Sequence, residues 1–193
     1  MLFKRKTAQA VIMVAMQKLI TAIIGKKVFS VHDGAAVAEV VGWLINKDNF
    51  KVELIVVAVP EMKAHKYILP AAIRVSTDRQ IIINSQDDIA EADELVRQRE
   101  MIASKYRLVG CKVETQSGKK LGRVMDFNFD YNTFYIAKIH VVSRFPQRIT
   151  RESFAINRSA VVEVQGNTVI VKDARVRAKA RRVGAKTLPA LPA

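Results

Sequence analysis

The chain has 193 residues, of which 50% are hydrophobic and 26% are charged, and its formal net charge is +14. This composition is that of a folded globular protein and excludes a fibrous or low-complexity one. The single cysteine, Cys111, excludes an internal disulfide and a cysteine-rich zinc site, and it fits a reducing, cytoplasmic location.

Residues 1–23 form a basic and apolar lead-in. Its apolar run is interrupted by Gln9, Gln17 and Lys18, whereas a membrane-spanning helix needs roughly 20 apolar residues in succession. No convincing small-residue cleavage site follows the run, so a secretory signal peptide is not expected. We therefore expect no transmembrane segment in this chain.

Residues 24–84 form the first copy of an internal repeat. Alternating and β-branched residues predict strands over 26–31, 37–45, 51–59 and 80–84. Asp33-Gly34 and Lys47-Asp48-Asn49 supply turn residues that tolerate a positive φ.

Residues 85–107 are predicted to form a linker helix between the copies. Ser85 or Asp87 is the expected N-cap, and the acidic residues that follow suit the positive end of a helix. An apolar stripe formed by Ile89, Ala92, Val96 and Met101 or Ile102 could dock on one barrel or between the two.

Residues 108–173 form the second copy. Strands are predicted over 112–115, 121–129, 133–142, 160–165 and 168–172. The two copies align with an offset of 85 residues, which falls to 84 and then to 81 along the chain. The offset of 81 pairs Ile68 with Ile149, Ile81 with Val162 and Ile83 with Val164. Many short strands with tight turns predict a mainly β fold of two small antiparallel β-barrels joined by the linker helix.

The motifs that open each copy resemble the PRC-barrel family. They are Ile24-Gly25-Lys26-Lys27-Val28, Val109-Gly110-Cys111-Lys112-Val113 and, above all, Ser117-Gly118-Lys119-Lys120-Leu121-Gly122-Arg123-Val124. The motif over residues 117–124 is similar to the family's turn and second strand. The first copy departs from it, because Ala38 stands at the position of Gly122. The resemblance implies PRC-type barrels over residues 24–172. It also implies a non-catalytic binding or scaffold role, as in the ribosome maturation factor and the cytoplasmic part of the reaction-centre H subunit.

Basic residues that differ between the copies are the candidate polyanion-binding residues. The excess of positive charge lies in the two ends and the second copy, and residues 174–193 read as a basic, disordered tail. A solubilising extension is the alternative interpretation of that tail. The candidates are Arg144, Arg148, Arg151, Arg158, Arg175, Arg177, Lys179, Arg181 and Arg182.

Catalytic, cofactor and metal sites are not predicted. His32, His65 and His140 are scattered, and the acidic residues from Asp87 to Glu94 are explained by helix capping and a solvated face. Phe127 and Phe134 align with Trp43 and Phe50, which favours a core role over base stacking, while the strand alternation leaves Tyr135 freer.

The expected function is that of a non-catalytic, cytoplasmic binding or scaffold protein that mediates protein assembly, with a role in RNA or ribosome metabolism as one setting. One alternative is an assembly factor that binds RNA or a ribonucleoprotein through the basic second barrel and tail. Another is an adaptor attached peripherally to a membrane. A homo-oligomer remains open as a further arrangement, and no small-molecule substrate is expected.

Overall fold

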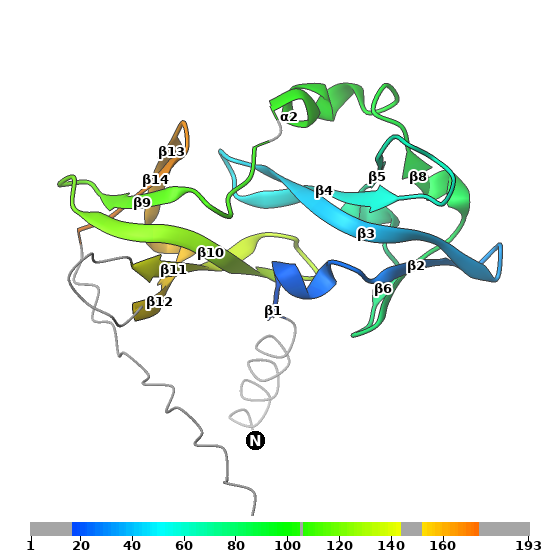
Figure 1. Cartoon of the computed structure of the whole chain (residues 1–193), viewed down its shortest axis with the longest axis horizontal. Coiled ribbons are helices and arrows are strands. Elements are labelled where there is room, and N and C mark those ends of the chain that lie inside the picture. The colour runs from blue at the N-terminus through cyan, green and yellow to red at the C-terminus, as the bar shows by residue number, and fades with distance from the viewer. Residues whose placement is uncertain (1–16, 105, 144–151, 174–193) are drawn as a thin grey trace, which may run out of the picture.

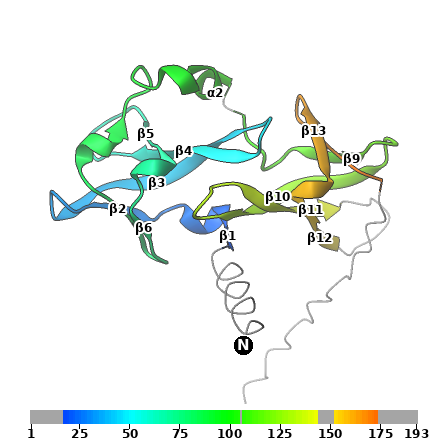
Figure 2. The same cartoon turned by 180° about the vertical axis from the view of Figure 1, so that it is seen from behind.

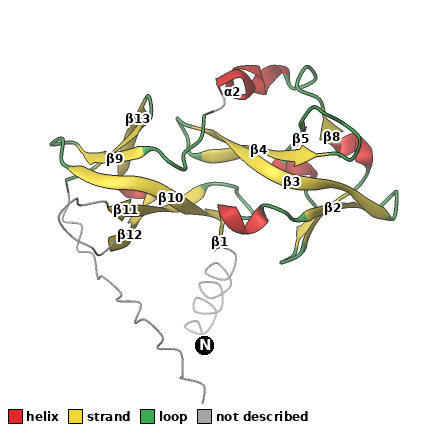
Figure 3. Cartoon of the chain, in the orientation of Figure 1, coloured by secondary structure: helices red, strands yellow, loops and turns green. Residues whose placement is uncertain are grey.

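The computed structural model describes residues 17–104, 106–143 and 152–173. It is mainly β, with two seven-stranded sheets that lie side by side in both views (Figure 1, Figure 2). Among the described residues the only α-helix is the six-residue α2 (Arg99–Ser104), so strands and loops dominate the picture (Figure 3).

The first sheet is built entirely from the first copy and the start of the linker, in the order β6-β7-β2-β3-β4-β5-β8. Its strands are β2 (Lys27–Ser30), β3 (Ala35–Asn46), β4 (Lys51–Ala58), β5 (Lys66–Ile68), β6 (Val75–Ser76), β7 (Gln80–Ile83) and β8 (Ile89–Ala90). The β3–β4 turn forms because the Asn46 side chain accepts hydrogen bonds from the amides of Asp48 and Asn49, and Phe50 adopts a φ of 58°.

The second sheet has the order β12-β11-β10-β9-β14-β13, and β1 pairs with β10 outside this path. Its strands are β1 (Gln17–Leu19), β9 (Lys112–Thr115), β10 (Lys120–Asp130), β11 (Ile136–Ser143), β12 (Glu152–Asn157), β13 (Val161–Gln165) and β14 (Thr168–Val171). The end of the lead-in thus joins the sheet of the second copy. Across the described residues the first sheet has a linear strand order, whereas β10 of the second sheet pairs with three strands, β9, β11 and β1.

The two copies pair their strands in the same register. In the first copy β2 runs parallel to β7 and Val28 lies opposite Ile81, while in the second β9 runs parallel to β14 and Val113 lies opposite Val169. The pairing of Ile55 with Ile68 likewise matches that of Ile139 with Ile156. Six strands of each sheet therefore repeat in the same order, whereas β8 and β1 have no counterpart in the other sheet.

This register corrects the predicted alignment beyond β4. Ile68, Ile81 and Ile83 correspond to Ile156, Val169 and Val171, and not to Ile149, Val162 and Val164. The connection after the third strand of the repeat is therefore longer in the second copy. The alignment failed because short β-branched runs look alike, so that Val162 and Val164 fit the apolar pattern as well as the true equivalents do.

One hydrophobic core extends through both copies, from Val28, Val40 and Val57 to Val113 and Val141. Equivalent residues meet where the copies join. The amide of Val52 donates to the carbonyl of Phe134, and the amide of Ile136 donates to the carbonyl of Phe50, each at 2.9 Å.

The reciprocal bonds place the two copies about a local pseudo-twofold axis. Lys51 and Tyr135, which are equivalent positions, form a β-bridge between the sheets. The rings of Trp43 and Phe127, also equivalent, pack edge to face with centroids 5.9 Å apart. The chain is thus arranged like a dimer within a single polypeptide.

The predicted helix over 85–107 differs from the observed structure. Ser85 does act as an N-cap, in a capping box with Asp88, but it caps only a 3-10 turn over Gln86–Asp88. β8 and a second 3-10 turn (Val96–Gln98) then precede α2. Leu95, Met101 and Ile102 pack on Leu44 and Leu54, on the face of the first sheet opposite the shared core, so tertiary contacts override the local helix signals.

Candidate functional site

Arg158 is the only predicted polyanion-binding residue within the described part of the chain. Its guanidinium lies 4.3 Å from the centroid of the Phe50 ring, and its Nη1 donates to the carbonyl of Val161. The side chain therefore joins the second copy to the first by a cation–π contact. The other eight candidates lie outside the described residues: Arg144, Arg148, Arg151, Arg175, Arg177, Lys179, Arg181 and Arg182.

A groove of about 690 Å³ lies instead over β9 and β10 of the second copy. This size falls within the range of about 300–1,000 Å³ that is typical of ligand sites. We call it the β9–β10 groove. It is lined by Val109, Gly110, Lys112, Val113, Glu114, Lys120, Leu121, Gly122, Arg123, Val124, Met125, Val142 and Ser143.

A β-bulge at Leu121 shapes this groove. The register between β9 and β10 passes from Lys120 opposite Glu114 to Gly122 opposite Val113, which leaves Leu121 as the extra residue. Gly122 has a φ of 149°, and a Cβ atom there would lie 2.2 Å from the carbonyl oxygen of Val142. Only glycine allows β10 to come this close to β11.

The charges of the groove differ from those at the equivalent positions of the first copy. In the first copy Lys27 lies opposite Glu39, and the two side chains form an ion pair of 2.5 Å. In the second copy the same positions hold Lys112 opposite Arg123. Like charges that face each other destabilise a strand pair. The shared fold therefore gives no reason for Arg123 to stand at the position of Glu39.

Arg123 and Lys120 complete the basic rim. The Nη1 atom of Arg123 donates to the carbonyl of Gly110 at 2.9 Å, which holds the guanidinium over the groove, and both side chains are exposed. Glu114 is the one carboxylate among the groove-lining residues and lies opposite Lys120. Within the described part of the chain Lys112 and Lys120 have no ion-pair partner, so the rim carries an excess of positive charge.

A polar strip lies beside the groove on β10 and β11. Asp126 is opposite His140 in the register, Asn128 contacts the His140 Nε2 atom, and Thr21 donates to Asp126. Burial lowers the pKa of His140, and the Asp126 carboxylate opposes that shift. The equivalent positions of the first copy include Leu44 and Val56, which the linker covers.

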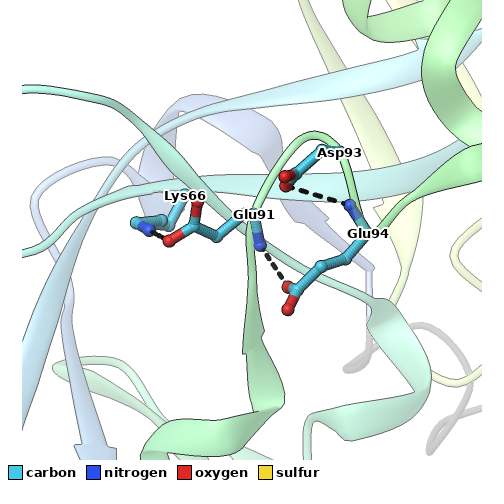
Figure 4. A network of polar contacts seen from close by, with 4 residues as sticks. All are labelled: Lys66, Glu91, Asp93 and Glu94. Atoms are coloured by element: carbon cyan, nitrogen blue, oxygen red, sulfur yellow. Dashed lines mark hydrogen bonds and ion pairs between the residues drawn. The ribbon is translucent and has the colours of Figure 1, made fainter.

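A second, smaller hollow of about 310 Å³ is rich in carboxylates and lies where the linker passes β5. Here the buried Lys66 ammonium binds Glu91, the Glu94 carboxylate accepts the Glu91 amide at 2.7 Å, and Asp93 accepts the Glu94 amide (Figure 4). These carboxylates satisfy the turns of the linker itself. No group of side chains among the described residues is arranged to hold a metal ion.

Cys111 is buried and forms part of the structural core. Its thiol donates to Asn167 Oδ1 at 2.8 Å, and burial raises its pKa, which disfavours the reactive thiolate. Phe127 and Phe134 are buried, which confirms the predicted core role. Tyr135 is 47% exposed, but it precedes β11, which begins at Ile136 and not at residue 133 as predicted; its ring centroid lies 5.8 Å from the Lys51 ammonium.

The residues of the groove were not among those predicted from the sequence. The signal was present in the repeat, because Arg123 stands where the first copy has Glu39 and Lys120 where it has Ala36. The prediction gave weight to the arginines of the loop and tail instead.

Compared with known protein families and with curated proteins, the chain matches none of them. Within the described residues no helix has the length and apolar character needed to cross a membrane.

Proposed function

We propose that the chain is a non-catalytic binding or scaffold protein with two PRC-type repeats, and that the second repeat holds a partner protein in the β9–β10 groove. The first repeat and the linker then serve as the rigid support of that groove. A shared core and reciprocal backbone bonds between the copies give the support its rigidity.

One observation carries this proposal: the Lys27–Glu39 ion pair of the first copy is replaced by Lys112 and Arg123 at the rim of an open groove. The two pairs occupy equivalent positions in the same backbone register, and neither pair is part of the hydrophobic core. A residue pair that is neutral in one copy and doubly positive in the other therefore reflects a requirement other than folding. Binding of a partner is such a requirement.

The test uses the full chain as bait and a variant that reverses the groove charge, Lys112→Glu with Arg123→Glu. A matched control, Lys47→Glu with Lys63→Glu, changes the net charge equally at two exposed residues of the first copy that do not line the groove. Proteins and nucleic acids retained from a cell lysate at low salt are quantified, with and without nuclease. Thermal unfolding of all three proteins checks that the fold is preserved.

We expect the wild type and the control to retain a specific protein in the presence of nuclease. The groove variant should retain at least about tenfold less of that protein, which corresponds to about 1.4 kcal/mol of binding free energy. Purified, that protein should bind with the same dependence on the groove. Equal retention by all three baits would refute the proposal. If nuclease abolishes the retention of the protein, the second candidate below is favoured.

A second candidate is an assembly factor that binds RNA or a ribonucleoprotein. The net charge of +14 and the basic groove rim favour it. Its expected signature is a groove-dependent affinity for single-stranded RNA that falls steeply between 50 and 200 mM salt. Groove-dependent sedimentation with anionic vesicles would instead indicate the membrane adaptor.

A further inference from the structure

We infer that the partner segment held in the β9–β10 groove is acidic and carries an apolar side chain that enters the groove between its basic residues. This inference rests on the function proposed above and adds the chemistry of the ligand. It follows from three properties of the groove: its charge, its apolar surface and the residue types that it lacks.

The charge of the groove calls for carboxylates. Lys112 and Arg123 face each other across β9 and β10, and Lys120 lies two register positions away. Glu114 offsets one of these three charges. An acidic segment would relieve the repulsion between Lys112 and Arg123, whereas a basic or neutral segment would leave it in place.

Arg123 is the best placed of the three to bind a carboxylate. One Nη atom already donates to the Gly110 carbonyl at 2.9 Å, which restrains the guanidinium at that end and leaves its other donors facing solvent. A guanidinium held in one orientation binds a carboxylate with a smaller loss of side-chain entropy than a free lysine does.

The surface between the charges is apolar. Leu121, Val142 and Val109 are half-buried in the groove wall, and Met125 is 62% exposed at its edge. An exposed methionine is a flexible apolar contact that adapts to the side chain it meets. A leucine, isoleucine or phenylalanine of the partner would cover this surface and gain hydrophobic free energy.

Nucleic acid fits the groove less well than a peptide. Single-stranded RNA is held by aromatic side chains that stack on its bases, and none of the groove-lining residues in the described part of the chain is aromatic. Tyr135, the exposed aromatic among the described residues of this copy, lies at the junction of the two copies, where Lys51 lies over its ring.

The inference is tested by selection from a library of random dodecapeptides against the full chain at 50 mM salt. The same selection is made against the Lys112→Glu/Arg123→Glu variant and the Lys47→Glu/Lys63→Glu control. Enriched peptides are then synthesised, and their affinities are measured by fluorescence anisotropy. Each is compared with a version that has Asn and Gln in place of Asp and Glu, and with a version that has Ser in place of its apolar residues.

We expect enrichment of peptides that combine Asp or Glu with a large apolar residue. Binding should weaken at least about tenfold with the groove variant, and with either altered peptide. Met125→Ala should weaken binding of the selected peptides without changing their dependence on acidic residues. Binding should also weaken as salt rises from 50 to 500 mM, because the contacts are exposed.

Groove-dependent peptides that lack acidic residues would refute the inference while leaving the proposed binding function intact. Peptides that bind equally to the groove variant, or a library with no enriched sequence, would refute both. Light scattering at increasing protein concentration is the last arm. Self-association that the groove variant abolishes would assign the groove to a second copy of this chain and thereby overturn the inference.

Discussion

Gly122 occupies a backbone position that an L-amino acid cannot share without moving a strand. Its φ is 149°, and an added Cβ would lie 2.2 Å from the Val142 carbonyl oxygen. Gly122→Ala is therefore expected to lower the free energy of unfolding by about 1–3 kcal/mol, a range typical of strained backbone positions. The measurement is chemical denaturation followed by circular dichroism.

The matched control is Gly118→Ala, in which the φ is also positive, at +81°, but nothing lies within 4 Å of the added Cβ. This control isolates the backbone cost from the steric clash. If the two variants lose the same stability, the close approach of β10 to β11 at Gly122 is not what requires the glycine.

His140 gives the stability of the protein a dependence on pH. Burial lowers its pKa, the Asp126 carboxylate opposes this, and the nearby Lys138 adds to it. A lowered pKa means that the unfolded chain binds the proton more readily than the folded one. Stability is then complete above the unfolded value of about 6.5 and falls as the pH drops through the folded pKa.

We therefore expect the unfolding free energy of the wild type to decrease between pH 7.5 and pH 5, and to decrease less in His140→Gln. His65→Gln, which alters an exposed loop residue, is the control and should retain the wild-type profile. Denaturation midpoints at half-unit pH steps provide the measurement. A His140→Gln profile parallel to that of the wild type would assign the pH dependence to other groups.

At the scale of elements, the linker acts as a cover for the first sheet. Leu95 is 7% exposed and packs with Leu44 and Leu54, whereas the adjacent Val96 is 70% exposed. Leu95→Ala should lower the unfolding free energy by about 2–5 kcal/mol, as buried leucines do. Val96→Ala should change it by less than about 0.5 kcal/mol. Equal effects, measured by thermal and chemical unfolding, would show that the linker does not contribute to the fold through this cover.

Sequence patterns predicted the elements whose signals are local and failed where distant contacts decide. The hairpin turns near Gly34 and Asn49 and the strands beside them were predicted because turn residues and alternation are local signals. The linker was predicted as a helix because its capping residues are strong. In the structure Leu95 packs on Leu44 and Leu54 of the first sheet, and this contact interrupts the helix. The sequence of the linker alone does not indicate such a distant contact.

The candidate site was only partly within reach of the same reasoning. Positions that differ between the two copies are not required by the fold that the copies share. The repeat shows Arg123 in place of Glu39, but only the strand register shows that Arg123 lies opposite Lys112. Arg158, in contrast, differs between the copies for a structural reason, its contact with the Phe50 ring.

At the scale of the whole molecule, the two copies are joined too closely to unfold independently. Their core is continuous, Trp43 packs on Phe127, and the backbones of Phe50 and Phe134 exchange hydrogen bonds with the opposite copy. We therefore expect one cooperative unfolding transition. Trp43 is the sole tryptophan and reports on the junction by fluorescence, while circular dichroism reports on both sheets. The two denaturation curves should coincide.

Equivalent core substitutions make this prediction sharper. Val40→Ala in the first copy and Val124→Ala in the second each remove buried methyl groups and should lower stability by about 1–3 kcal/mol. Because the unit is cooperative, each variant should reduce the hydrogen-exchange protection of β4 and β11 by the same amount. If Val124→Ala reduces protection in β11 alone, the copies are separate folding units. The junction would then be a docking contact, and the support proposed for the β9–β10 groove would come from the second copy by itself.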